Sequence, residues 1–299
     1  MVEEIVRFLD PQPEQWIIDG TLGFGGHSEC FLDAGAQVLG IDQDPEAFAR
    51  AQERLGRFGK RFQMAHGNSS QLTKLLAESL NVPAAVDGVL FDLGVSSWQL
   101  DQAERGFSFQ QDGPLDMRMN PNATQTAADL VNQLPEADLR TIFWEYGEER
   151  AGRGVAEAIV LRREERPFER TIDLAAVVAG RVHRRSRIHP ATRTFQALRI
   201  AVNRELEVLP EMLSQAVDVI KPGGKIAVIS FHSLEDRIVK TFLRQRSLVQ
   251  LDDPTWPEPR VNPEYQLDLP VRLVKPTEEE SKRNPRARSA RLRFAVKRA

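Results

Sequence analysis

The residues best suited to chemistry in this chain are three aspartates, Asp19, Asp42 and Asp92, each of which ends a run of residues typical of a buried strand. The three runs are residues 16–19, 38–42 and 86–92. The carboxyl ends of parallel strands meet at one edge of a sheet, which is where ligands bind in such folds. A carboxylate at this edge, above all that of Asp42, can accept hydrogen bonds from ribose hydroxyls.

A glycine-rich segment, residues 20–28, follows the first of these acids and reads GTLGFGGHS. Its glycines at 23, 25 and 26 remove side chains that would keep a cofactor away from the backbone. A dinucleotide site of the G-x-G-x-x-G kind needs a third glycine at position 28, and Ser28 stands there instead. Acid-ended strands suit a cofactor that carries a positive sulfonium and no pyrophosphate, namely S-adenosylmethionine. The alternative is that the glycines only form a flexible turn between a strand and a helix.

Size and composition indicate a soluble globular protein. The chain has 299 residues, of which 41% are hydrophobic, and a formal net charge of -3. Neither an apolar run of about 20 residues nor a signal segment is evident, so we expect a cytoplasmic protein with no membrane partner. The one cysteine, Cys30, has no partner for an internal disulfide, and the sequence indicates no metal site.

Basic residues gather in two places, which favours a polyanionic substrate, although such runs are more often solvated faces. The first cluster comprises Arg181, His183, Arg184, Arg185, Arg187, His189, Arg193 and Arg199. The second, in the C-terminal tail, comprises Lys282, Arg283, Arg286, Arg288, Arg291, Arg293, Lys297 and Arg298.

Strands and helices alternate through the first third of the chain, which predicts an α/β fold with a parallel sheet. Expected strands are 16–19, 38–42, 61–65 and 86–92, and expected helices are 27–34, 45–55 and 69–80. The next strand, 225–231 after a turn at 221–224, comes about 130 residues later, far beyond the roughly 30 residues of a βαβ crossover.

The intervening segment has helical periodicity, at 127–134, 137–146, 155–163 and 174–182. We therefore expect an inserted helical substrate-recognition domain at 106–205, interrupting a cofactor-binding domain formed by 1–105 and 206–299. After it we expect a helix at 233–246, a loop at 254–263 and a closing pair of strands at 271–274 and 291–296.

Asp92 is the first candidate for catalysis. An aromatic exocyclic amine is a poor nucleophile because its lone pair is delocalised into the ring, and an acceptor for its N–H groups would localise that pair. Asp92 could equally bind the cofactor or cap the following turn.

Phe107 and Phe109 could stack on a base or pack in a core, and His232 could face the same cleft or serve a structural role.

Several longer motifs resemble one known family. They are DGTLGFGGH at 19–27, DLGVSS at 92–97, ERGFSF at 104–109, DGPLDMRM at 112–119, HPATRTFQ at 189–196, SFHSLEDR at 230–237 and NPRARS at 284–289. Together they are similar to the bacterial ribosomal RNA small-subunit methyltransferase H family, also called RsmH or MraW.

The resemblance implies a class I methyltransferase fold with an inserted helical domain. It implies methyl transfer from S-adenosyl-L-methionine to N4 of a cytidine in the decoding region of small-subunit (16S) ribosomal RNA, either as RNA or within the 30S subunit. The family's cofactor contacts fall on Gly25, Gly26, His27, Asp42, Asp92 and Gln99. One further contact, usually a phenylalanine, falls on Ser69.

Two other functions remain as alternatives. A DNA amino-methyltransferase is disfavoured, and no stable DNA partner is expected, because Asp92-Leu93-Gly94-Val95 replaces the Asn/Asp/Ser-Pro-Pro-aromatic motif. The second alternative is a non-catalytic RNA-binding factor for ribosome assembly that retains the cofactor fold.

Overall fold

The computed structural model describes residues 1–182, 188–271 and 273–299, which form two compact units. The first unit comprises Met1–Gly94 and Leu206–Ala299, and the second comprises Val95–Glu205. Positions 183–187 of the first basic cluster and position 272 of the expected strand 271–274 lie outside the described residues. No helix of the described chain is long and apolar enough to cross a membrane.

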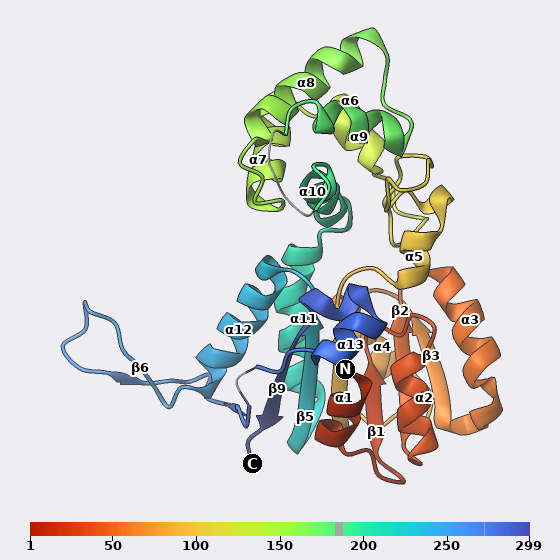
Figure 1. Cartoon of the computed structure of the whole chain (residues 1–299). Helices are drawn as coiled ribbons and strands as arrows, with labels where there is room; N and C mark the ends of the chain where they lie inside the picture. The colour runs from red at the N-terminus through yellow and green to blue at the C-terminus, as the bar shows by residue number, and fades with distance from the viewer. Residues whose placement is uncertain (183–187, 272) are drawn as a thin grey trace. The chain divides into compact units, whose positions relative to one another are not determined.

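The first unit is built on a seven-stranded sheet with the order β3-β2-β1-β4-β5-β9-β8 (Figure 1). Its strands are β1 (Trp16–Asp19), β2 (Gln37–Asp42), β3 (Phe62–His66), β4 (Val86–Asp92), β5 (Ile220–Ser230), β8 (Leu267–Asp268) and β9 (Arg291–Lys297). The first five run parallel, whereas β9 is antiparallel to both β5 and β8. The predicted α/β fold with a parallel sheet is therefore confirmed.

Both faces of the sheet are buried under helices. Successive strand residues alternate between two cores, so that Ile18 and Phe91 belong to one and Ile17 and Leu90 to the other. The first core is covered by α4 (Leu72–Glu78), α11 (Glu205–Val219) and α12 (Ser233–Ser247). The second is covered by α1 (Val2–Leu9), α2 (Gly26–Asp33) and α3 (Pro45–Leu55).

Capping residues set several helix boundaries. The Asp44 side chain accepts a hydrogen bond from the N–H of Glu46, and Pro45 occupies the first turn, so α3 begins where the sequence predicts. The short helices η1 (Gly56–Arg61) and η2 (Ser69–Gln71) precede β3 and α4. Near the C-terminus, α13 (Glu278–Arg283) and η4 (Pro285–Ser289) lead into β9.

Some expectations for the first unit were wrong. The expected strand 225–231 begins earlier, because β5 starts at Ile220; the expected turn residues 221–224 bulge out between the pairs Val86–Ile220 and Gly88–Lys225. The expected loop 254–263 contains β7 (Arg260–Val261), which pairs with β6 (Gln250–Leu251). Within 271–274, Val274 makes only an isolated bridge to Leu292, and β8 is the strand that pairs with β9.

The second unit is helical and has a core of its own. It contains α5 (Ser97–Asp101), η3 (Ala103–Arg105), α6 (Ala127–Gln133), α7 (Glu136–Glu145), α8 (Gly152–Glu165), α9 (Thr171–Ala179) and α10 (Thr192–Asn203). The four predicted helices correspond to α6 to α9, whereas α10 was not predicted. Val95 and Leu100 pack against this core, so the second unit begins after Gly94 rather than at residue 106.

A buried acid holds the last strand to α12 in the first unit. Asp236 accepts hydrogen bonds at 2.7 Å from Arg291 Nη1 and from Arg293 Nε, and its side chain is 6% exposed. Burial opposes ionisation, but the two guanidiniums outweigh it and lower the pKa of Asp236. Arg291 and Arg293, which the sequence placed in a basic binding cluster, therefore serve the fold.

We expect Asp236→Asn to destabilise the first unit by about 3 kcal/mol at pH 7, because it removes a buried carboxylate charge that two guanidiniums share, that of Arg293 being mostly buried. The lowered pKa means that the ion pair stabilises the fold above the pKa of an unfolded aspartate, about 3.9, and that this stabilisation is lost as the pH falls. Urea unfolding at pH 7 and pH 3 measures both effects. The control is Arg298→Gln, which removes an exposed pair with Asp268 and should change stability by less than about 1 kcal/mol. Equal losses for the two variants would contradict this account.

Candidate functional site

The candidate site lies at the carboxyl edge of the parallel strands, where the strand order reverses between β1 and β4. Open α/β sheets bind ligands at such a switch point. Asp19, Asp42 and Asp92 end β1, β2 and β4, as the sequence predicts. The turn after β1 is tied to both neighbouring strands, because Gly20 N–H donates to Leu90 O and Leu22 N–H donates to Ile41 O.

Two of these carboxylates accept hydrogen bonds from nearby N–H and O–H groups. Asp19 is fully buried and accepts hydrogen bonds from Ser28 Oγ at 2.7 Å and from Thr21 N–H. Asp42 accepts hydrogen bonds from the backbone N–H groups of Gly23 and Asp44, at 2.8 and 2.9 Å. Burial nevertheless raises the pKa of Asp19, and it raises the pKa of Asp42 to about 6.

Asp92 is paired with His27 at the start of α2. The Nε2 atom of His27 lies 3.5 Å from Asp92 Oδ2. Burial of His27 opposes protonation, but the hydrogen bond and charge of Asp92, with the charge of Asp19, outweigh it and raise the pKa of His27. The remaining polar atoms of the pair, His27 Nδ1 and Asp92 Oδ1, are buried and have no hydrogen-bond partner among the described residues.

The glycines of the turn serve different purposes. Gly25 has a φ of 74°, which favours glycine, and a Cβ there would lie 2.5 Å from Leu55 Cδ1. Gly26 has no such restriction, because the nearest atom to a Cβ there is Arg54 Nη1 at 3.9 Å. The fold itself therefore requires glycine at position 25, and it leaves open space beside position 26.

Ser69 and Gln99, the other two predicted contacts, have structural partners. The Ser69 hydroxyl donates to the carbonyl of Gly20, which ties the segment after β3 to the end of β1. Gln99 lies in the second unit, where its side chain and that of Ser96 form a capping box at the start of α5. Gly25, Gly26, His27, Asp42, Ser69 and Asp92 all belong to the first unit, with Ser69 and the strand-end acids bonded to the same turn.

Other candidates have structural roles. His232 caps α12: its Nδ1 accepts from Glu235 N–H, and its Nε2 lies 3.1 Å from Glu235 Oε1. Phe107 is buried in the core of the second unit, and Phe109 packs on His189 and Phe195 at ring-centroid distances of 4.5 and 4.9 Å.

Seven of the eight residues of the C-terminal basic cluster, all but Arg286, divide into two groups. Arg291 and Arg293 bind Asp236, Lys297 donates to the carbonyls of Val217 and Ile220, and Arg298 binds Asp268. The side chains of Lys282, Arg283 and Arg288, on α13 and η4, are exposed and make no hydrogen bond or ion pair within the part of the chain that is described. Only the second group is available to a polyanion.

Two site residues were missed because they lie within the glycine motif and were not assigned a role. Thr21 Oγ1 accepts from Asp92 N–H at 2.6 Å, and Ser28 donates to Asp19. Ser28 replaces the third glycine of a dinucleotide site, which was the available signal. The Ser28 hydroxyl compensates part of the negative charge that the strand ends bring together, and the Thr21 hydroxyl ties the turn to the end of β4.

This arrangement suits a cation with hydrogen-bonding groups. Buried carboxylates attract positive charge, the two unpartnered atoms of the His27–Asp92 pair can bind polar groups, and a carboxylate after β2 can accept ribose hydroxyls. An S-adenosyl sulfonium compound has all of these features, so the residues present fit this class of cofactor.

Comparison with known proteins identifies relatives over the whole chain. The MraW methylase family matches residues 1–298. A protein of Pelobacter propionicus named ribosomal RNA small subunit methyltransferase H is 49% identical over 310 residues, covering 99% of this chain and 97% of its own. One of the same name from Syntrophotalea carbinolica is 50% identical, covering 98% and 95%. Among solved structures, an rRNA methylase from Streptococcus thermophilus aligns over 100% of this chain and 96% of its own, with 10% identity and a TM-score of 0.47.

The turn glycines offer a paired test. We expect Gly25→Ala to lower the free energy of unfolding by at least about 1 kcal/mol, because alanine is strained at this φ and its methyl group contacts Leu55. Gly26→Ala should change the free energy of unfolding by less than about 0.5 kcal/mol. It should nevertheless weaken S-adenosylmethionine binding, because its methyl group fills the space through which the ligand approaches the backbone. Calorimetric unfolding and ligand titration measure the two effects. Equal stability of the two variants would show that the fold does not depend on Gly25.

Proposed function

The chain belongs to the MraW methylase family, and from this premise we propose that it methylates N4 of a cytidine in the decoding region of small-subunit ribosomal RNA. S-adenosylmethionine is the methyl donor. The family match and the curated relatives support ribosomal RNA methylation as the reaction class. The observation that carries the finer proposal is the buried, unpartnered Oδ1 of Asp92 beside His27 at the switch point of the sheet.

We assign donor binding to Gly25, Gly26, His27, Asp42, Ser69, Asp92 and Gln99. When bound, S-adenosylmethionine supplies an electrophilic methyl group on a positively charged sulfur. Asp42 would accept hydrogen bonds from ribose hydroxyls, and Gly26 leaves room for close approach to the backbone. Ser69 acts through the turn, because its hydroxyl already holds the Gly20 carbonyl.

Asp92 is the proposed catalytic residue. Its Oδ2 faces His27, which leaves Oδ1 to accept a hydrogen bond from the exocyclic amine of the cytosine. This interaction would localise the nitrogen lone pair toward the methyl carbon as the new N–C bond forms and the S–C bond breaks. The amine then loses one proton, for which the Asp92 carboxylate is the nearest acceptor in this scheme. His27 would hold Asp92 in place and share its charge.

The RNA substrate is supported by the distribution of positive charge. Lys282, Arg283 and Arg288 are exposed cations in the unit that contains the site, and each phosphate they neutralise releases counterions. We assign substrate recognition to the second unit. A base within folded RNA must reach Asp92 single-stranded or flipped out. The substrate is RNA or the 30S subunit, and the reaction is cytoplasmic.

Labelled S-adenosylmethionine and small ribosomal subunits that lack the modification test the activity. We expect label in the RNA and, by mass spectrometry, one added methyl group on N4 of a cytidine. Asp92→Asn should reduce the rate at least about 100-fold, with donor affinity changed only a few-fold. The control is Asp87→Asn at the opposite end of β4, where Asp87 pairs with Lys221. Transfer only to protein or DNA would refute the substrate, and a normal rate for Asp92→Asn would remove Asp92 from catalysis.

The raised pKa of Asp42, about 6, predicts pH-dependent donor binding. A protonated carboxyl is a poorer acceptor for ribose hydroxyls, so affinity should be full above pH 7 and fall below pH 6, by at most tenfold per pH unit. Titration calorimetry from pH 5 to 8 measures this. Asp42→Asn should bind more weakly and lose this dependence. A wild-type affinity that stays constant over the range would exclude a contact between the Asp42 carboxylate and the donor.

A further inference from the structure

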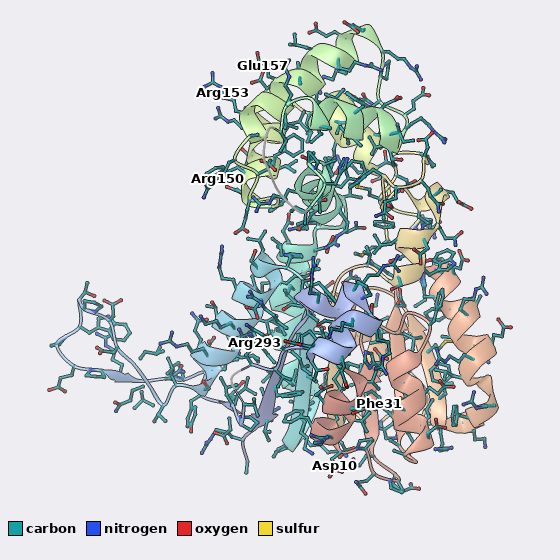
Figure 2. All side chains as sticks on the ribbon, viewed as in Figure 1. Asp10, Phe31, Arg150, Arg153, Glu157 and Arg293 are labelled. Atoms are coloured by element: carbon teal, nitrogen blue, oxygen red, sulfur yellow. The ribbon has the colours of Figure 1, made fainter. Side chains whose placement is uncertain are left out.

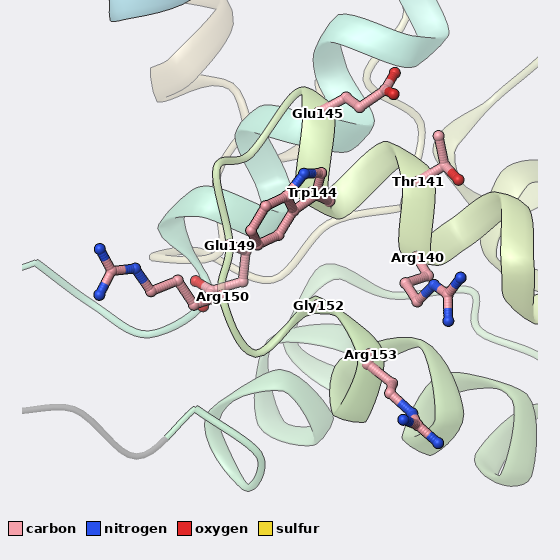
Figure 3. Close-up of a pocket in the computed structure, with 8 residues that line it drawn as sticks. All are labelled: Arg140, Thr141, Trp144, Glu145, Glu149, Arg150, Gly152 and Arg153. Carbon is pink, nitrogen blue, oxygen red and sulfur yellow. The ribbon is translucent and has the colours of Figure 1, made fainter.

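A pocket in the second unit combines an exposed tryptophan with three arginines. It lies between α7, the following loop and the start of α8, and has a volume of about 430 Å³. This volume falls within the roughly 300–1,000 Å³ typical of ligand pockets. Its lining residues are Arg140, Thr141, Trp144, Glu145, Glu149, Arg150, Gly152 and Arg153 (Figure 3).

The Trp144 ring differs from the other tryptophans of the chain. Trp16 is buried in the sheet core, and Trp98 and Trp256 each lie beneath an arginine, with guanidinium-to-ring distances of 5.7 and 4.5 Å. Trp144 is 62% exposed, and no ring or cation contacts it in the described chain. A large aromatic surface is thus left open to solvent beside a pocket.

The arginines of this pocket are also unpaired. Arg140, Arg150 and Arg153 are exposed and make no hydrogen bond or ion pair with any described residue. Figure 2 shows Arg150 and Arg153 projecting from this unit, and in Figure 3 Arg140 and Arg153 point to one side of the pocket and Arg150 to the other. By contrast, the guanidiniums of Arg118, Arg163 and Arg199 are bound to acids or backbone carbonyls.

Local structure explains how these groups come together. Arg140 and Trp144 are four residues apart on α7 and therefore share one face of the helix. Gly152 lets α8 start close to α7, because a Cβ there would lie 3.2 Å from Phe143 Cβ. Of the two acids, Glu149 is buried and accepts a hydrogen bond from Ala151 N–H, so Glu145 is the exposed negative charge among three positive ones.

We propose that this pocket binds a single-stranded segment of the substrate RNA, with one base stacked on Trp144 and neighbouring phosphates bound by Arg140, Arg150 and Arg153. Stacking on an aromatic ring beside basic side chains is the usual way in which proteins hold unpaired nucleotides. An acidic peptide would use the arginines but would leave the indole surface without a partner. The proposal rests on the proposed function, because it takes RNA as the substrate.

Binding of a labelled single-stranded oligoribonucleotide, measured by fluorescence anisotropy, tests the pocket. We expect Trp144→Ala to weaken binding about tenfold, as loss of a stacked base does, and Trp144→Phe to retain part of the affinity. Replacing Arg140, Arg150 and Arg153 by glutamine should lower the slope of log affinity against log salt by about 2, at roughly 0.7 for each phosphate contact. RNA should also quench tryptophan fluorescence less in Trp144→Phe than in the wild type.

Matched controls separate a local effect from a general one. Arg166→Gln removes another exposed arginine at the end of α8, and Trp256→Phe removes a tryptophan of the first unit. Both should bind RNA normally, and every variant should keep wild-type donor affinity.

If the Trp144 and arginine variants bind RNA as tightly as the wild type, the pocket does not bind RNA. That result would leave the methylation proposal intact. Quenching of Trp144 by ribosomal proteins but not by RNA would overturn it in favour of a protein contact. A wild-type protein that neither binds nor methylates RNA would refute the proposed function itself.

Discussion

The convergence of carboxylates at one edge of the sheet is the constraint on which the rest of the first unit depends. Parallel strands bring the ends of β1, β2 and β4 together, and each of them ends in an aspartate. Burial of like charges is unfavourable, and the raised pKa values of Asp19 and Asp42 express this. Backbone N–H groups, the Ser28 hydroxyl and His27 compensate only part of that charge. A bound cation would relieve the remainder, so the site is electrostatically prepared for a sulfonium compound before the ligand arrives.

Local sequence signals were sufficient where each element carries its own pattern. β4 and α3 have the predicted bounds, because an apolar run ends at Asp92 and because Asp44 and Pro45 start a helix with an apolar stripe. Elements whose stability comes from distant partners were missed. The two residues of β8 form a strand only through pairing with β9, and the pairing of Ile220 with Val86 starts β5 five residues before the expected strand. The turn-forming residues Lys221 to Gly224 form a bulge between the two paired segments.

The position of the candidate site could be predicted from the sequence, but the roles of several of its residues could not. The acids at the strand ends were predicted from the motif, whereas the positive φ of Gly25 emerges only from the folded turn. The sequence could not show that Ser69 is bonded to Gly20, that His232 caps α12 or that Arg293 neutralises Asp236, because each partner is fixed by tertiary structure or by a cap. Trp144 gave no signal at all, since its helical position resembles that of a core residue. Exposure, which only the folded chain defines, is what distinguishes it.

The division of the chain has a consequence for the order of folding. The second unit is one continuous stretch, Val95–Glu205, with a separate core, whereas the sheet of the first unit joins β4 to β5 and then to β9 across nearly the whole chain. During synthesis on the ribosome the helical unit can fold as soon as it emerges. The sheet of the first unit is completed only later, because residues 291–297 form the strand that covers the outer edge of β5. Before β9 is made, the free edge of β5 can pair incorrectly with strands of other chains. The synthesis of β9 therefore ends the period in which this edge makes the nascent chain prone to aggregate.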